Sequence, residues 1–141
     1  MSVQLRPAAL LLIFLSKINK AIIYFKNGAI EVDIADSMLQ RAIGLSFRQS
    51  LEQNKGMYFY LFHQFNPVFW NFGMYFPIDV IWIKNNRVVG IEKNIPKMTS
   101  KIKIFSPGTL VDALIEVPAE TIDKIDIAVN DLILIKKRKF L

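Results

Sequence analysis

The residues of this chain that could do chemistry are two carboxylates and two arginines. Asp79 stands between Ile78 and Val80 inside an apolar run. A lone carboxylate is costly to bury, so Asp79 must be paired or extensively hydrogen-bonded. Arg41 is the partner that we prefer, and Arg48 is the second choice. The sequence therefore predicts a buried Asp–Arg pair.

Glu116, near the end of another apolar run, is the second carboxylate that needs a partner. Together with Asp79 it could form the carboxylate pair of a hydrolase, as in glycoside cleavage, although the sequence does not fix their separation. The other interpretation is a structural ion pair that fixes a helix to the body of the domain. A Ser-His-Asp triad would need His63 with Ser46 or Ser106, and neither serine lies in a nucleophile elbow.

The composition removes several kinds of site. The chain has no cysteine, which excludes disulfides, zinc–thiolate sites and thiol catalysis. Its single histidine, His63, removes metal sites built from several imidazoles. A phosphate-binding loop is absent, because no glycine-rich turn leads from a strand into a helix. We therefore expect neither a metal nor a cofactor.

Residues 66–83 (NPVFWNFGMYFPIDVIWI) are too apolar for a solvent-exposed loop. They must form core or the wall of a pocket. Trp70, Tyr75 and Trp82 could stack on a sugar or a base, or they could be core and edge aromatics of strands. Strand alternation would place Phe72 on the same face as Trp70, so both would be core or both would line a groove.

The net charge of +6 belongs to the ends of the chain. Residues 1–20 and 136–141 together carry seven basic side chains and no acid, so the body between them carries one net negative charge. Within the body, residues 84–103 hold six basic residues against Glu92 alone. This stretch could bind single-stranded nucleic acid or another polyanion, with affinity that falls with salt. A solvated edge whose lysines block strand pairing is the favoured interpretation, so nucleic acid is not the partner we expect.

Residues 1–20 contain an apolar run, Ala8–Leu15. The run is too short to cross a bilayer, which takes about 20 residues, but it has the length of a signal-peptide core. Three interpretations stay open: a signal or short anchor, an interfacial helix, and an extra segment packed on the domain. Membrane association through residues 1–20 is therefore as consistent with the sequence as a cytoplasmic location. We place a single domain at 21–136 and a basic tail at 137–141.

The elements that must position these residues are mostly strands. Ala21–Phe25 and Ala29–Ile34 flank Asn27-Gly28, which predicts a hairpin whose turn residues take positive φ. A short helix is predicted at 37–43, with Gly44 as its C′ residue. Further strands are predicted at 56–62, 80–84 and 87–91, the last two around Asn85-Asn86, and at 101–105, 110–117 and 131–136, with one helical turn between 118 and 126. The fold class is mainly β, a compact antiparallel barrel- or sandwich-like domain with one short α-helix.

Several short motifs follow one another along the chain: IEVDIAD at 30–36, RAIGL at 41–45 with Arg48, GMYF at 56–59, the run 69–83, and IE at 115–116. In this order they resemble the signatures of the domain of unknown function 192 family, with the central run in the archaeal style. The resemblance covers about residues 28–135. It implies a compact, mostly β, barrel-like domain with a short helix, and no established biochemical activity.

The chain departs from the pattern of that family at three places. Trp70-Asn71-Phe72 stands where the family usually has Trp-Met-Lys, so the usual lysine is missing. Ala119-Glu120 replaces Ala-Gly, and Asn130-Asp131 replaces Gly-Asp. Asn tolerates the left-handed region, so the last turn can survive the change.

From the sequence we expect a non-catalytic, small-ligand-binding or accessory domain with an aromatic-walled pocket near a buried Asp/Arg pair. The candidate ligand-binding residues are Arg41, Arg48, Trp70, Asp79, Trp82 and Glu116. The expected ligand is an unidentified small molecule or a carbohydrate. The alternatives are a hydrolase that uses Asp79 and Glu116, and a basic binder of polyanions. The sequence does not specify an oligomeric state.

Overall fold

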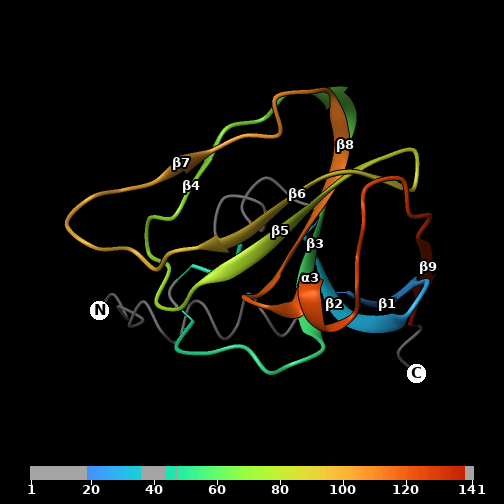
Figure 1. Ribbon diagram of the computed structural model, residues 1–141, viewed down its shortest axis with the longest axis horizontal. Coiled ribbons are helices and arrows are strands. Elements are labelled where there is room, and N and C mark those ends of the chain that lie inside the picture. Colours follow the sequence, from blue (N-terminus) through green and yellow to red (C-terminus); the bar gives the residue numbers. More distant parts are fainter. Residues whose placement is uncertain (1–18, 36–43, 47, 139–141) are drawn as a thin grey trace, which may run out of the picture.

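The computed structural model describes residues 19–35, 44–46 and 48–138 (Figure 1). Within these residues the elements are β1 (Lys20–Phe25), β2 (Gly28–Ala35), β3 (Lys55–Phe65), β4 (Phe69–Trp70), β5 (Ile78–Lys84), β6 (Arg87–Ile95), β7 (Ile104–Phe105), β8 (Val111–Pro118), α3 (Thr121–Lys124) and β9 (Leu134–Lys137). Seven strands form one sheet in the order β6-β5-β8-β3-β2-β1-β9, and β4 pairs with β7 in a second, small sheet.

The predicted fold class is confirmed in being mainly β, with a barrel- or sandwich-like sheet and one short helix among the described residues. The expectation of purely antiparallel pairing is wrong at one place, because β2 and β3 run parallel. Parallel neighbours need a long crossover, and residues 36–54 supply it. The helix predicted at 37–43 lies outside the described residues, whereas α3 forms where a helical turn was predicted between 118 and 126.

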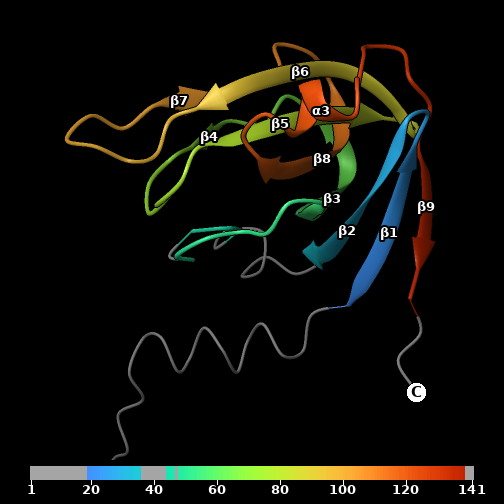
Figure 2. The same ribbon diagram turned by 60° about the horizontal axis from the view of Figure 1, so that its bottom comes forward.

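The large sheet is strongly curved. In Figure 2, β5, β6 and β8 run across the top of the molecule, while β1, β2 and β9 run down its right-hand side. Segments at the two ends of the strand order approach each other, because the Val88 N–H donates to Asp131 O (2.8 Å) and the Ile133 N–H donates to Asn86 O (2.9 Å). The sheet is therefore barrel-like without being closed.

Both predicted hairpins form, but only one uses the predicted turn geometry. In the β5–β6 hairpin, Asn85 (φ 50°) and Asn86 (φ 58°) both take positive φ. In the β1–β2 hairpin none of Lys26, Asn27 and Gly28 does, so the expected turn type is wrong there. Gly28 is needed for another reason, since a Cβ at this position would lie 3.0 Å from Cγ2 of Ile125.

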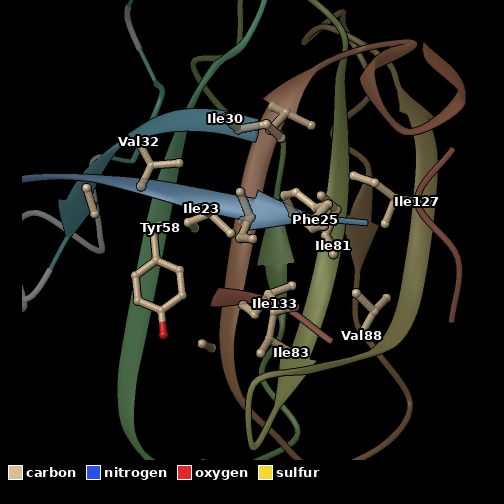
Figure 3. Close-up of a cluster of buried hydrophobic side chains, with 14 of the residues drawn as sticks. Ile23, Phe25, Ile30, Val32, Tyr58, Ile81, Ile83, Val88, Ile127 and Ile133 are labelled. Atoms are coloured by element: carbon tan, nitrogen blue, oxygen red, sulfur yellow. The ribbon is translucent and has the colours of Figure 1, made fainter. Parts of the chain in front are cut away.

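Two hydrophobic cores lie on the two faces of the large sheet. The inner core fills the concave side and gathers apolar residues from β1, β2, β5, β6 and β8 together with Ile122, Ile127 and Ile133 (Figure 3). The outer core lies on the opposite face, where Met57, Phe59, Val80, Trp82 and Leu114 meet the segments outside the sheet. Strands β3, β5 and β8 therefore have buried side chains on both faces, and any polar group there needs an internal partner.

Asp79 shows how the inner face meets that need. Its side chain is fully buried on β5. One carboxylate oxygen accepts from the Asn94 N–H (2.9 Å), where Asn94 has φ 55° at an irregularity in the pairing of β5 with β6. The other accepts from the Ile122 N–H (3.0 Å), in the first turn of α3. Asp79 thus caps the helix and fixes the irregularity through two backbone donors.

We expect Asp79→Ala to lower the free energy of unfolding by about 3 kcal/mol, because the buried Ile122 N–H and the part-buried Asn94 N–H lose a charged acceptor. The measurement is urea unfolding at neutral pH. Asp131→Ala is the matched control, since the Asp131 side chain accepts a single backbone bond, from the Ala128 N–H, in an exposed turn. That variant should lose about 1 kcal/mol. Equal losses in the two variants would contradict the capping role.

Candidate functional site

Arg48 and Asp33 form an Asp–Arg pair within the part of the chain that the structure describes. The guanidinium Nη2 of Arg48 donates to Asp33 Oδ2 over 3.2 Å. Asp33 lies on the outer face of β2, and Arg48 lies in the crossover that leads to β3. Lys20 contacts the other oxygen of Asp33 at 3.7 Å. The predicted pairing of Arg48 with Asp79 is therefore wrong, because backbone donors satisfy Asp79 and Arg48 has its own carboxylate. Arg41, the preferred partner, lies outside the described residues.

Glu116 lies behind this pair, on β8. It is opposite Met57 of β3, and Met57 belongs to the outer core, so the Glu116 side chain is on the outer face. Burial raises the pKa of the Glu116 carboxyl to about 7, against the Leu45 N–H and the Arg48 guanidinium, which lower it. Among the residues that the structure describes, four side-chain atoms are buried without a hydrogen-bond partner, and two of them, Glu116 Oε2 and Arg48 Nε, lie here; the others are Trp82 Nε1 and Glu92 Oε2.

Gly44 and Leu45 bring the crossover against Glu116. Gly44 has φ +51°, a conformation that favours glycine. A Cβ on Gly44 would lie 3.0 Å from the Phe59 ring and 3.5 Å from Glu116 Oε2. A side chain larger than hydrogen would therefore crowd the Phe59 ring, whereas 3.5 Å from the carboxylate is an ordinary contact.

A charged pocket of about 380 Å³ opens in front of Arg48, and we call it the polar pocket. It is lined by Lys20, Glu31, Asp33, Arg48, Ser50, Leu51, Glu52, Lys55 and Gly56. Most of its ionic side chains are paired: Lys20 and Arg48 contact Asp33, and Lys55 Nζ lies 2.9 Å from Glu31 Oε2. Arg138, outside the lining, also lies 3.3 Å from Glu31 Oε1. The lining holds three cations and three carboxylates, so it favours no net charge in a ligand.

Asp79 and Glu116 do not come together. Asp79 pairs with Val117 across β5 and β8, and its neighbours Ile78 and Val80 belong to the outer core. Asp79 therefore points to the inner face, while Glu116 points to the outer face. A carboxylate pair built from these two residues, as the hydrolase hypothesis requires, fails on this geometry.

The two tryptophans have different environments. Trp82 is buried in the outer core, where its ring centroid lies 6.0 Å from that of Phe69 and 6.2 Å from that of Phe105. Trp70 is exposed on β4. A pocket of about 410 Å³ that includes Asn94, whose N–H binds Asp79, has a single aromatic side chain in its lining, Phe76. Residues 66–83 therefore form core and surface more than a pocket wall.

An aromatic pocket of about 610 Å³ does exist, at a place that sequence reasoning missed. It is lined by Asn19, Ile34, Tyr58, Tyr60, Phe62, Ile135 and Lys137. Ile34 lines it whereas its neighbour Asp33 lines the polar pocket, so the two pockets open on opposite faces of β2. Burial, with Asp112 and Tyr60 nearby, raises the pKa of Tyr58 to about 12. The alternating aromatics of residues 58–62 were the available signal.

The remaining sequence-based predictions concern a metal site, a membrane-associated N-terminal segment and a basic polyanion-binding stretch. Within residues 19–35, 44–46 and 48–138, no three His, Asp or Glu side chains gather in a way that could hold a metal ion. No helix of this part of the chain is long and apolar enough to cross a membrane. Residues 1–18, which carry most of the predicted N-terminal segment, lie outside it, as do 139–141 of the basic tail. Of the basic residues at 84–103, Arg87 donates to Asn130 O and Lys93 pairs with Asp123.

The fold and this site define a small, open β-barrel domain with a polar pocket beside a buried carboxylate. Residues 21–135 match the family model for domain of unknown function 192 (DUF192), described as "Uncharacterized ACR". The chain belongs to this family, which confirms the resemblance seen in its motifs. The archaeal style of the central run stays a prediction. No curated protein matches the chain.

Two solved structures share the fold. One is a proposed transcription regulator from Sinorhizobium meliloti 1021, with 20% sequence identity and a TM-score of 0.74, covering 84% of this chain and 93% of that protein. The other is a protein of unknown function from Novosphingobium aromaticivorans DSM 12444, with 21% identity and a TM-score of 0.71, covering 83% of this chain and 84% of that one. At these identities the likeness shows the fold alone.

The raised pKa of Glu116 gives a pH dependence with a definite sign. The folded value of about 7 lies above the ordinary 4.5, so the native state holds this proton more tightly than the unfolded state. The contribution to stability is full below about pH 4.5 and is lost as the pH rises through about 7. We expect wild-type protein to lose up to about 3 kcal/mol across this range relative to Glu116→Gln, by urea unfolding at several pH values.

Glu52→Gln, in the exposed part of the crossover, is the control substitution. Other titrating groups are common to all three proteins, so their effects cancel in the differences. If Glu116→Gln followed the same pH curve as wild type, the carboxyl would not be titrating at a raised pKa.

Proposed function

We propose that the protein is a non-catalytic binding domain whose polar pocket takes a small, neutral, polyhydroxylated ligand such as a carbohydrate. The observation that carries the proposal is the buried, unpartnered Nε of Arg48 at the back of the polar pocket, in front of the buried Glu116 carboxyl. A buried polar atom without a partner costs about 1–3 kcal/mol, so such atoms in a native protein need an explanation. A binding site held ready for a polar ligand is one.

The class of ligand follows from the lining of the pocket. Cations and carboxylates occur there in equal numbers, so an anion and a cation would each meet repulsion as well as attraction. A hydroxyl both donates and accepts, and can therefore bond to Asp33 and to Arg48 without a charge of its own. Leu51 supplies an apolar contact for the face of a sugar ring.

The position of Glu116 favours binding over hydrolysis. A carboxyl with a pKa of about 7 would suit a general acid or base. However, Glu116 is buried behind Arg48 and is not part of the pocket lining, so a bound substrate would meet Arg48 first. The carboxyl therefore supports the loop that carries Arg48.

The test is a titration followed by ¹⁵N–¹H NMR, with glucose, mannose, N-acetylglucosamine and trehalose as probes. At least one sugar should give saturable shifts at the backbone amides of residues 50–56. Arg48→Lys should weaken that binding about tenfold or more, because lysine keeps the charge but cannot reproduce the guanidinium geometry. Arg87→Lys, at the exposed β5–β6 hairpin, should leave it unchanged.

Two results would count against the proposal. No saturable shift at these amides with any of the four sugars would contradict a carbohydrate site. Release of nitrophenol from nitrophenyl glycosides by wild-type protein, lost in Glu116→Gln, would show that the protein is a hydrolase.

A further inference from the structure

The segments 66–77 and 96–110 form an arm that extends from the large sheet, with β4 and β7 along it (Figure 1). Phe69 pairs with Phe105, and Trp70 pairs with Ile104. Paired residues share a face of the arm, and successive residues alternate. Phe69 and Phe105 face inward onto Trp82, so Trp70 and Ile104 face outward.

Asn71 connects the two segments of the arm to each other. This buried side chain donates to Pro96 O (2.9 Å) and accepts from the Lys103 N–H (2.8 Å). Its own N–H donates to Lys103 O (3.0 Å), and the Met98 N–H donates to Met74 O (2.8 Å). The outward face is therefore held in one shape by the backbone.

The outward face is apolar and strongly exposed. Val68 is 68% exposed, Trp70 62% and Ile104 65%, and Ile102, two positions before Ile104, is also exposed. Few soluble surfaces leave a tryptophan and several aliphatic side chains together in water unless something covers them.

The charge around this face has one sign. Segments 66–77 and 96–110 contain Lys97, Lys101 and Lys103 and no acid. Lys103 interacts with Glu92 of β6, whereas Lys97 and Lys101 are exposed in the part of the arm that precedes β7. An exposed apolar face beside uncompensated lysines is complementary to a surface that is apolar beneath and negatively charged on top.

We propose that the arm is a membrane-docking surface that inserts Trp70 and Ile104 at the interface of a bilayer containing anionic lipid. Tryptophan is the side chain that prefers the level of the lipid headgroups. Lysine can bury its methylene stem along the apolar surface while its ammonium group stays at the phosphates. The arm docks on the surface and does not span the bilayer.

Two other occupants fit less well. A symmetric contact with a second copy would bring the lysines of both arms together with no acid in either arm to neutralise them. Single-stranded nucleic acid binds by stacking on open aromatic faces. The Trp70 ring is tilted against the partly exposed Phe72 ring, with ring centroids 6.0 Å apart, and the other outward residues, Val68, Ile102 and Ile104, are aliphatic.

The test is co-sedimentation of the full chain with vesicles of phosphatidylcholine alone and of phosphatidylcholine mixed with phosphatidylglycerol. Wild-type protein should bind the mixed vesicles, with a blue shift of tryptophan emission from Trp70, since Trp82 is already buried. The double variant Trp70→Ser, Ile104→Ser should partition onto the mixed vesicles at least about tenfold more weakly than wild type. Lys97→Gln with Lys101→Gln should also weaken binding about tenfold.

The matched controls lie on β9. Leu134 is 65% exposed, as Ile104 is, so Leu134→Ser removes an equally exposed apolar side chain elsewhere. Lys136→Gln with Lys137→Gln removes two exposed charges there. All variants keep residues 1–18, so any contribution of that segment is common to them. Binding that is unchanged in the arm variants, that falls equally in the β9 variants, or that ignores anionic lipid would overturn the proposal. The proposal would also be overturned if wild-type protein did not bind vesicles but bound single-stranded DNA or associated with itself, and the arm variants lost that binding.

Discussion

The buried carboxylate of Glu116 is the constraint to which the outer face of this domain is adapted. Strand β8 lies in the middle of the sheet order, with cores on both faces, so Glu116 cannot reach water. The Leu45 N–H and the Arg48 guanidinium are the groups that meet it. Both belong to the crossover between the parallel strands β2 and β3. The buried Glu116 carboxyl therefore positions the wall of the polar pocket.

The sequence predicted the strands well because most of their signals are local. The hairpin at Asn85-Asn86 needs two residues that accept positive φ, and the sequence shows them. Gly28 looked like the same signal, but it is needed for a tertiary contact with Ile125 that no local pattern reveals. Glu120 has φ 75° where the family usually has glycine, so here the surrounding structure imposes the turn on an unfavourable residue.

The candidate site was only partly predictable. Burial of Asp79 and Glu116 followed from their apolar neighbours, and both are buried. Their partners did not follow, because backbone N–H groups leave no trace in the sequence: Asp79 bonds to Asn94 and Ile122, which are distant along the chain. Which face of the sheet each carboxylate occupies depends on strand order and register. Asp33 is the actual partner of Arg48. The sequence pattern identified it only as one polar residue of an alternating strand, because the pattern does not give the strand order.

The account depends most on the contact between the Glu116 carboxyl and the loop that carries Arg48. The direct measurement is an NMR titration of the Glu116 side-chain carboxyl carbon, in wild-type protein and in Arg48→Met. We expect a wild-type pKa of about 7, and a higher pKa in the variant, because the guanidinium lowers it. A wild-type pKa near the ordinary 4.5, or a value that Arg48→Met leaves unchanged, would contradict a buried Glu116 that holds the pocket wall in place.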